Sequence, residues 1–153
     1  MGTQTKLTLT VTSPAFGQSG LIPSKYTCEG ENINPALEIK SIPQETKSLV
    51  LIIDDPDAPG GTFDHWIVWN IPPAENIEEN SIPGTEGMNN FGKIGYRGPC
   101  PPSGIHRYFF KIYALDSELD IKKGAKKKQV EDAMKGHIIA SGELIGTYRK
   151  KGG

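Results

Sequence analysis

A continuous apolar run at residues 48–53 ends in two aspartates and leads into a turn at 55–61 that holds two prolines and two glycines. Such a run is typical of a strand that is buried on both faces of a sheet. The next segment, 65–71, is also apolar and stops at a pair of prolines. Because proline fixes φ and glycine permits unusual values, segment 55–61 predicts a sharp turn between two core strands.

Other segments have a similar β character. Residues 106–115 place Tyr, Phe, Ile and Ala on one face, and residues 6–12 alternate between apolar side chains and polar ones. Both patterns predict strands, and weaker strand patterns occur at 37–40 and 143–148. One segment, 125–135, has helical periodicity, and the glycine that follows it suits a helix C-terminus.

The length of 153 residues predicts a single domain, 1–153. Its 18 glycines and 12 prolines suit a turn-rich β protein. Turns rather than regular crossover helices join the predicted strands, which favours an antiparallel sandwich or barrel over a doubly wound sheet. Segments 13–34 and 74–105 are predicted to be loops, and a loop as long as the second is often functional.

Charge and composition exclude several classes of protein. The formal net charge is -1, whereas a general nucleic-acid binder normally has a clear basic excess. No apolar run approaches the roughly 18 residues of a membrane-spanning helix, so we expect no integral membrane segment. No signal-peptide pattern is visible, which predicts a cytoplasmic location. Two cysteines are too few for a zinc site built mainly of cysteine.

Polar side chains gather where the predicted core strands begin or end, beside conspicuous turns. If these strand ends meet, two imidazoles and a phenol converge beside the backbone amides of two turns, and such donors bind a small anion. Neighbouring aspartates are expected to orient the histidines and to raise their pKa. The set consists of Asp55, Asp57, His65, His106, Arg107 and Tyr108.

Other interpretations of these residues remain open at this point. Each histidine can be an ordinary strand residue, or two histidines and a carboxylate can form a metal centre. Ser103 and Cys100 lie near His106 in the sequence, but this proximity does not establish a nucleophile and its base. The favoured interpretation therefore has no catalytic residue, no metal and no cofactor.

Two further features concern surfaces. Trp66 and Trp69 are three residues apart in a strand, so they lie on opposite faces, and we expect one in the core and the other at the site or an interface. The lysine-rich segment 122–128 is expected to be a solvated helix face, with contact to phospholipid headgroups or an acidic partner as the alternative.

Two long blocks resemble the signatures of the phosphatidylethanolamine-binding protein family, in its prokaryotic Raf-kinase-inhibitor-like branch. They are Asp-Pro-Asp-Ala-Pro-Gly-Gly-Thr-Phe-Asp-His-Trp at 55–66 and Gly-Tyr-Arg-Gly-Pro-Cys-Pro-Pro-Ser-Gly-Ile-His-Arg-Tyr-Phe-Phe at 95–110. Segments 26–32, 113–116 and 144–148 add to the resemblance. It implies two antiparallel sheets with Greek-key connections, one or two peripheral helices and a small anion-binding pocket.

The resemblance implies that this pocket is formed by Asp55, Asp57, Pro59, His65, Gly98, Pro99, His106, Arg107 and Tyr108. The expected ligand is a small anion, such as phosphate or a phospholipid headgroup. The expected function is that of a non-enzymatic binding protein that regulates a protein partner, a kinase or a serine protease. The alternatives are a serine-protease inhibitor that presents a surface loop and, less favoured, a cryptic hydrolase or metal enzyme.

Three structural expectations accompany the resemblance. The peptide bond between Ala58 and Pro59 is predicted to be cis, because the turn must reverse within a few residues. Cys28 and Cys100 are predicted to lie close together, and whether they form a disulfide depends on the redox compartment. A homodimer is also expected, since an exposed Trp66 or Trp69 would suit a symmetric interface.

Overall fold

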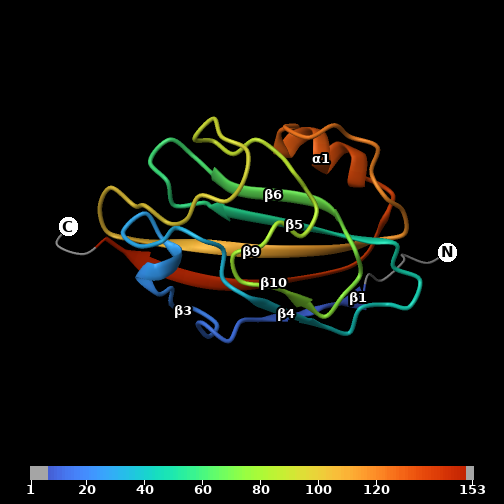
Figure 1. Cartoon of the computed structure of the whole chain (residues 1–153), viewed down its shortest axis with the longest axis horizontal. Coiled ribbons are helices and arrows are strands. Elements are labelled where there is room, and N and C mark those ends of the chain that lie inside the picture. Colours follow the sequence, from blue (N-terminus) through green and yellow to red (C-terminus); the bar gives the residue numbers. More distant parts are fainter. Residues whose placement is uncertain (1–6, 151–153) are drawn as a thin grey trace.

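The computed structural model describes residues 7–150 and is dominated by β-strands (Figure 1). The large sheet has the order β1-β10-β9-β5-β6-β8, with β3 also paired to β10, and the small sheet has the order β2-β4-β7. The strands of the large sheet are β1 (Leu7–Thr8), β3 (Gly20–Leu21), β5 (Ser48–Asp55), β6 (Phe63–Ile71), β8 (Thr85–Glu86), β9 (Ile105–Leu115) and β10 (Ile138–Arg149). Those of the small sheet are β2 (Thr10–Thr12), β4 (Leu37–Lys40) and β7 (Asn76–Ile77). The predicted mostly β fold of two sheets is confirmed.

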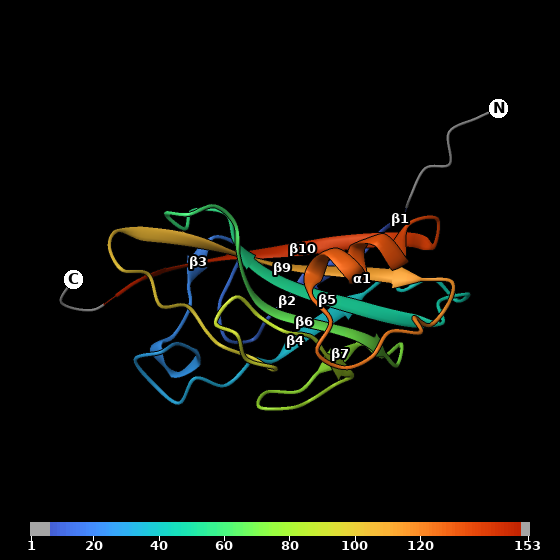
Figure 2. The ribbon, with the colours of Figure 1, turned by 90° about the horizontal axis from the view of Figure 1, so that it is seen from above.

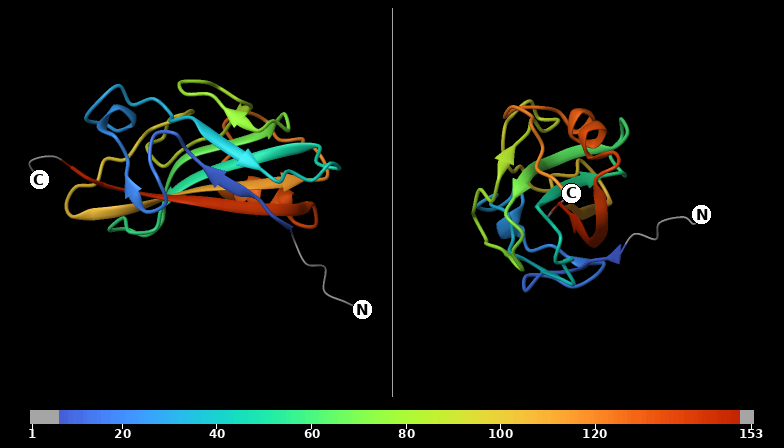
Figure 3. Two further views of the ribbon diagram at one scale, coloured as in Figure 1. Left: turned by 90° about the horizontal axis from the view of Figure 1, so that it is seen from below. Right: turned by 90° about the vertical axis from the view of Figure 1, so that its right-hand side faces the viewer.

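The described part of the chain contains one α-helix, α1 (Lys127–Met134), and one 3-10 turn, η1 (Ser24–Tyr26). Figure 2 shows α1 against one face of the large sheet, and the view from below in Figure 3 shows β2 and β4 on the opposite face. The molecule therefore has a helix, a large sheet and a small sheet in successive layers. Within residues 7–150, no helix has the length and apolar character needed to span a membrane.

The four long strands of the large sheet are antiparallel to their neighbours. Strand β5 pairs with β6 on one side and with β9 on the other, and β9 pairs with β10. The short strands β1 and β3 pair with β10 in parallel, which the sequence did not predict. The predicted strand at 6–12 is divided at Leu9, because β1 joins the large sheet and β2 joins the small one.

Alternating side chains of the large sheet fill two separate cores. One face packs against the small sheet and contains Trp66 and Tyr108, and the other face packs beneath α1, where Trp69 shares a core with Val130 of the helix. The two tryptophans do lie on opposite faces, but both are buried. The expectation that one of them reaches the site or an exposed interface is wrong, because α1 covers the second face of the strand.

The turn between β5 and β6 contains no cis peptide bond, so the prediction of a cis bond before Pro59 is wrong. The chain reverses by other means. The backbone N–H of Gly61 donates to the Ala58 carbonyl, and Gly61 has a φ of 112°, which glycine adopts without steric cost. The side chain of Asp55 also accepts a hydrogen bond from the backbone N–H of Asp57. Together these contacts close the turn with a trans proline.

Candidate functional site

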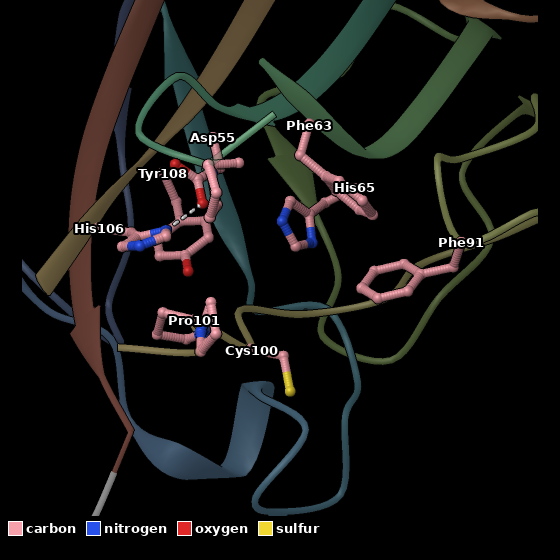
Figure 4. Close-up of a pocket in the computed structure, with 11 residues that line it drawn as sticks. Asp55, Phe63, His65, Phe91, Cys100, Pro101, His106 and Tyr108 are labelled. Atoms are coloured by element: carbon pink, nitrogen blue, oxygen red, sulfur yellow. Dashed lines mark hydrogen bonds and ion pairs between the residues drawn. The ribbon is translucent and has the colours of Figure 1, made fainter. Parts of the chain in front are cut away.

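A cavity of about 170 Å³ lies where β5 ends and β6 and β9 begin (Figure 4). Its wall combines two histidines, one carboxylate and one phenol with a larger number of apolar side chains. The lining residues are Asp55, Ala58, Pro59, Phe63, His65, Phe91, Cys100, Pro101, Pro102, His106 and Tyr108. The cavity therefore contains the two histidines that the sequence analysis placed in one site.

Strand register brings these residues together from distant parts of the chain. Asp55 is paired with Phe63, and Asp54 is paired with both Asp64 and Phe109. Successive side chains of a strand point to opposite faces, so Asp55 and Asp54 face in opposite directions. Asp55 lines the cavity, whereas Asp54 lies within 3.1 Å of the Lys111 ammonium group. The same alternation places His65, His106 and Tyr108 at the cavity.

The buried residues Asp55 and His106 form a close pair. His106 Nδ1 lies 2.6 Å from Asp55 Oδ2, and the other carboxylate oxygen accepts the backbone N–H of Asp57 at 2.7 Å. Since both oxygens act as acceptors, the shared hydrogen is on His106 Nδ1. Asp55 therefore fixes the orientation and the tautomer of the His106 ring, and the other ring nitrogen, Nε2, makes no hydrogen bond to residues 7–150.

His65 is held in the same way by a different acceptor. Its Nδ1 lies 2.7 Å from the Arg97 backbone carbonyl, which can only accept, so Nδ1 is protonated. Burial lowers the pKa of His65 below its ordinary value and outweighs the opposite effect of the carboxylates of Asp55, Asp64 and Asp54. The aspartates thus act on the pKa of His65 in the expected direction, but the expected upward shift is wrong for this residue because burial has the larger effect.

Tyr108 lies between the two imidazoles. Its ring makes an edge-to-face contact with His65 at a centroid distance of 5.3 Å and is nearly parallel to His106 at 6.5 Å. Burial raises the pKa of Tyr108 far above its ordinary value, so the phenol is neutral. The nearby backbone N–H of Cys100 lowers the pKa of Tyr108, but this effect is smaller than that of burial. The buried hydroxyl makes no hydrogen bond of normal geometry to residues 7–150.

Aromatic side chains form the rim of the cavity beside His65. The ring centroids of Phe63 and Phe91 are 4.7 Å apart, and those of Phe91 and His65 are 5.6 Å apart. The Phe91 residue is 45% exposed, so it is available to a ligand that extends out of the cavity. The entrance is therefore apolar, and the hydrogen-bonding groups lie deeper.

Asp57 and Arg107 are close to the cavity but do not line it. The Arg107 guanidinium donates two hydrogen bonds of 2.9 Å to the Asp57 carboxylate, and the Arg107 backbone N–H donates a third. The guanidinium holds the pKa of Asp57 at about 2. The side chain of Arg107 is 53% exposed, so this pair ties the turn after β5 to the start of β9 from outside.

Gly98 and Pro99 also lie behind the wall of the cavity. The Gly98 N–H donates to Asn32 Oδ1, and the Pro99 carbonyl accepts from the N–H of Cys28. A Cβ at Gly98 would lie 2.0 Å from the Tyr26 carbonyl oxygen, so this position requires glycine. These contacts fasten the segment that carries the cavity-lining residues 100–102 to the loop at 26–32.

A disulfide joins Cys28 to Cys100, with their Cα atoms 5.5 Å apart. The predicted proximity is confirmed, and the pair is bonded. Because Cys100 is in a disulfide, it has no thiol and is not a nucleophile for His106. Within residues 7–150, no three His, Cys, Asp or Glu side chains form a cluster suited to a metal ion.

Sequence reasoning missed much of the apolar wall. Ala58, Pro101 and Pro102 lie inside the two blocks that identified the site, so their positions there were a usable signal. Phe63 precedes His65 by two residues and therefore shares its face of the strand. Phe91 lies in the long loop at 74–105 and had no periodic pattern that could reveal it.

The family model for phosphatidylethanolamine-binding proteins matches residues 12–149, and the chain belongs to this family. A UPF0098 protein of Pyrococcus horikoshii is 52% identical over an alignment of 161 positions. The alignment covers 98% of this chain and 81% of that protein. A UPF0098 protein of Methanothermobacter thermautotrophicus is 51% identical over 144 residues, which cover 89% of this chain and 95% of that protein.

Two solved structures share the fold. A phosphatidylethanolamine-binding protein homologue from Chlamydia trachomatis superposes with a TM-score of 0.91 at 46% identity, covering 94% of this chain and 99% of that one. E. coli YbcL, described as a member of the mammalian family, has a TM-score of 0.86 at 29% identity with the same coverage. The resemblance found in the sequence is therefore confirmed for the family and for the fold.

Proposed function

We propose that this protein is a non-enzymatic binding protein whose cavity takes a small anionic group, such as phosphate or the phosphate of a phospholipid headgroup. The observation that carries the proposal is the buried Tyr108 hydroxyl, a neutral donor without a hydrogen-bond partner among residues 7–150. A buried hydroxyl without a partner costs free energy. A ligand oxygen in the cavity would supply the missing acceptor.

The size and the polar groups of the cavity support such a ligand. A cavity of about 150 Å³ in another protein accommodates benzene, so about 170 Å³ suffices for a phosphate-sized group. His106 offers a further donor at Nε2 when its ring is charged, and the Asp55 carboxylate already faces that ring. Hydrogen bonds with an ionised donor or acceptor are roughly twice as strong as bonds between neutral groups.

Calorimetric titration with inorganic phosphate and with phenyl phosphate tests the proposal. We expect Tyr108→Phe to lose about 1–3 kcal/mol of binding free energy, because it removes one hydrogen bond to a charged group. The stability of this variant should fall little, since within residues 7–150 the hydroxyl has no hydrogen bond of normal geometry to lose. Tyr113→Phe is the matched control, because Tyr113 is on the same strand but packs on the helix side of the sheet.

Two results would reject the proposal: absence of binding to the unaltered protein at millimolar ligand, or equal affinity in the unaltered protein and Tyr108→Phe.

The regulatory role, through a kinase or serine-protease partner, rests on family membership alone. Incubation with chymotrypsin-like and elastase-like proteases tests the inhibitor alternative. Sedimentation at micromolar concentration tests the homodimer, for which neither tryptophan supplies an exposed patch.

A further inference from the structure

The two imidazoles of the cavity share a feature that determines what kind of anion they accept. In each ring Nδ1 forms a hydrogen bond with a protein oxygen. The partner is the Arg97 carbonyl for His65 and the Asp55 carboxylate for His106. A neutral imidazole has one hydrogen, so Nε2 of each neutral ring has a lone pair and acts as an acceptor. Either ring becomes a donor toward the cavity only when it is charged.

The two rings differ in their surroundings. His106 contacts a carboxylate directly, so its charged form has a counter-ion 2.6 Å away. His65 contacts an uncharged carbonyl and is enclosed by Phe63, Phe91 and Tyr108. The charged groups that influence His65 are Asp55, Asp54 and Asp64, and burial still lowers the pKa of its ring. His65 therefore presents an acceptor near neutral pH, whereas His106 can present a donor.

The charges of the wall add a second restriction. The carboxylate of Asp55 lines the cavity, and a protonated His106 only cancels it. The cation of Arg107 is directed to Asp57 outside the cavity and is neutralised there. Among the described lining residues no positive charge is left over, so the wall favours a ligand with one negative charge over a ligand with two.

We infer that the cavity selects a monoanionic acid group that still carries one hydrogen, and discriminates against an anion of equal charge that has none. This inference rests on the proposed function. In the bound state the acidic hydrogen of the ligand is donated to His65 Nε2. Tyr108 and charged His106, which line the same cavity (Figure 4), donate to the remaining ligand oxygens. A phosphomonoester in its singly charged form has this chemistry, and its second pKa is about 6.

Phenyl phosphate and phenyl sulfate are the decisive pair of probes, measured by calorimetry at pH 6. Both have a phenyl ring for the aromatic rim and a tetrahedral anionic group, but phenyl sulfate has no acidic hydrogen. Its oxygen would face the lone pair of His65, which leaves a buried acceptor unpaired. We expect phenyl sulfate to bind at least about tenfold more weakly than phenyl phosphate, which corresponds to about 1.4 kcal/mol.

A substitution at His65 tests whether this ring is the source of the discrimination. His65→Gln places an amide there, which can donate or accept, so the ratio of the two affinities should fall to about one. His137→Gln is the matched control, because His137 is an exposed histidine paired with Asp116 away from the cavity, and it should leave the ratio unchanged. If the glutamine variant does not fold, the comparison in the unaltered protein still decides.

The outcomes separate the two proposals. Binding of phenyl phosphate with weak or undetectable binding of phenyl sulfate supports the inference. Equal affinities overturn the inference and leave the anion site intact, because they mean that both imidazoles donate. Failure of both probes to bind the unaltered protein overturns the proposed function and the inference together. Tighter binding of phenyl sulfate also overturns the inference.

Discussion

Removal of the disulfide between Cys28 and Cys100 should strongly destabilise this fold. The two cysteines are 72 residues apart in the sequence, and the bond closes a loop that includes β5 and β6. The double variant Cys28→Ala/Cys100→Ala removes the cross-link while keeping a small apolar side chain at each position. The other contacts between these segments remain, including the hydrogen bond from the Cys28 N–H to the Pro99 carbonyl.

The magnitude follows from the length of the closed loop. In the chain-entropy model, a cross-link over a loop of this size restricts the unfolded chain by about 4 kcal/mol. For a chain of about 150 residues, each kcal/mol shifts the unfolding temperature by roughly 2–4 °C. The variant should therefore unfold about 8–16 °C below the oxidised protein. Its unfolded state should also be more expanded, which raises the denaturant m-value.

Thermal and urea unfolding of the oxidised protein, the reduced protein and the double variant test this reasoning. Reductant should lower the stability of the unaltered protein to about that of the variant and should leave the variant unchanged. A shift below about 3 °C on removal of the bond would refute the entropic argument. An unchanged m-value together with a large shift would place the effect in the folded state instead.

Two further predictions concern buried polar groups and pH. Trp66→Phe should lower the free energy of unfolding in urea by about 1–2 kcal/mol more than Trp69→Phe does. The reason is that Trp66 Nε1 donates to the buried Glu86 carboxylate, whereas Trp69 Nε1 has no hydrogen-bond partner in the described chain. Equal losses in the two variants would contradict this. Asp57, whose pKa Arg107 lowers to about 2, stabilises the fold above its unfolded pKa near 3.9, and this contribution disappears as pH falls through about 2. The free energy of unfolding of Asp57→Asn, measured by urea unfolding, should therefore be lower than that of the unaltered protein at pH 6. This difference should vanish in acid. A difference that does not change with pH would be evidence against the ion pair.

The long strands could be predicted from sequence because their periodicity reflects burial directly. The segment 48–53, which is apolar after Ser48, became the first six residues of β5, which is buried on both faces between β6 and β9. The alternation at 106–115 became β9, where Tyr108 and Phe110 enter the core with the small sheet. Short pairings such as that of β3 with β10 depend on tertiary contacts and have too few residues to show a period.

The site was predicted as a set of residues but not as an arrangement. The two blocks gave the histidines, the aspartates and Tyr108, since strand ends that follow neighbouring turns meet at one edge. The prediction did not separate residues that line the cavity from those that support it, such as Arg107 and Gly98. That distinction depends on which way each side chain points, and the direction is fixed by contacts to segments far away in the sequence.

The chemistry of the two histidines illustrates the same limit at the level of single atoms. An imidazole in a sequence is equally a donor or an acceptor, and its partner at one ring nitrogen determines what the other presents. For His65 that partner is the Arg97 carbonyl, 32 residues away, and for His106 it is Asp55, 51 residues away. Because one partner is neutral and the other is charged, we expect these two identical side chains to take different roles in one cavity. An anion that uses both must therefore both donate and accept hydrogen bonds, which a partly protonated acid group does and a fully ionised one does not.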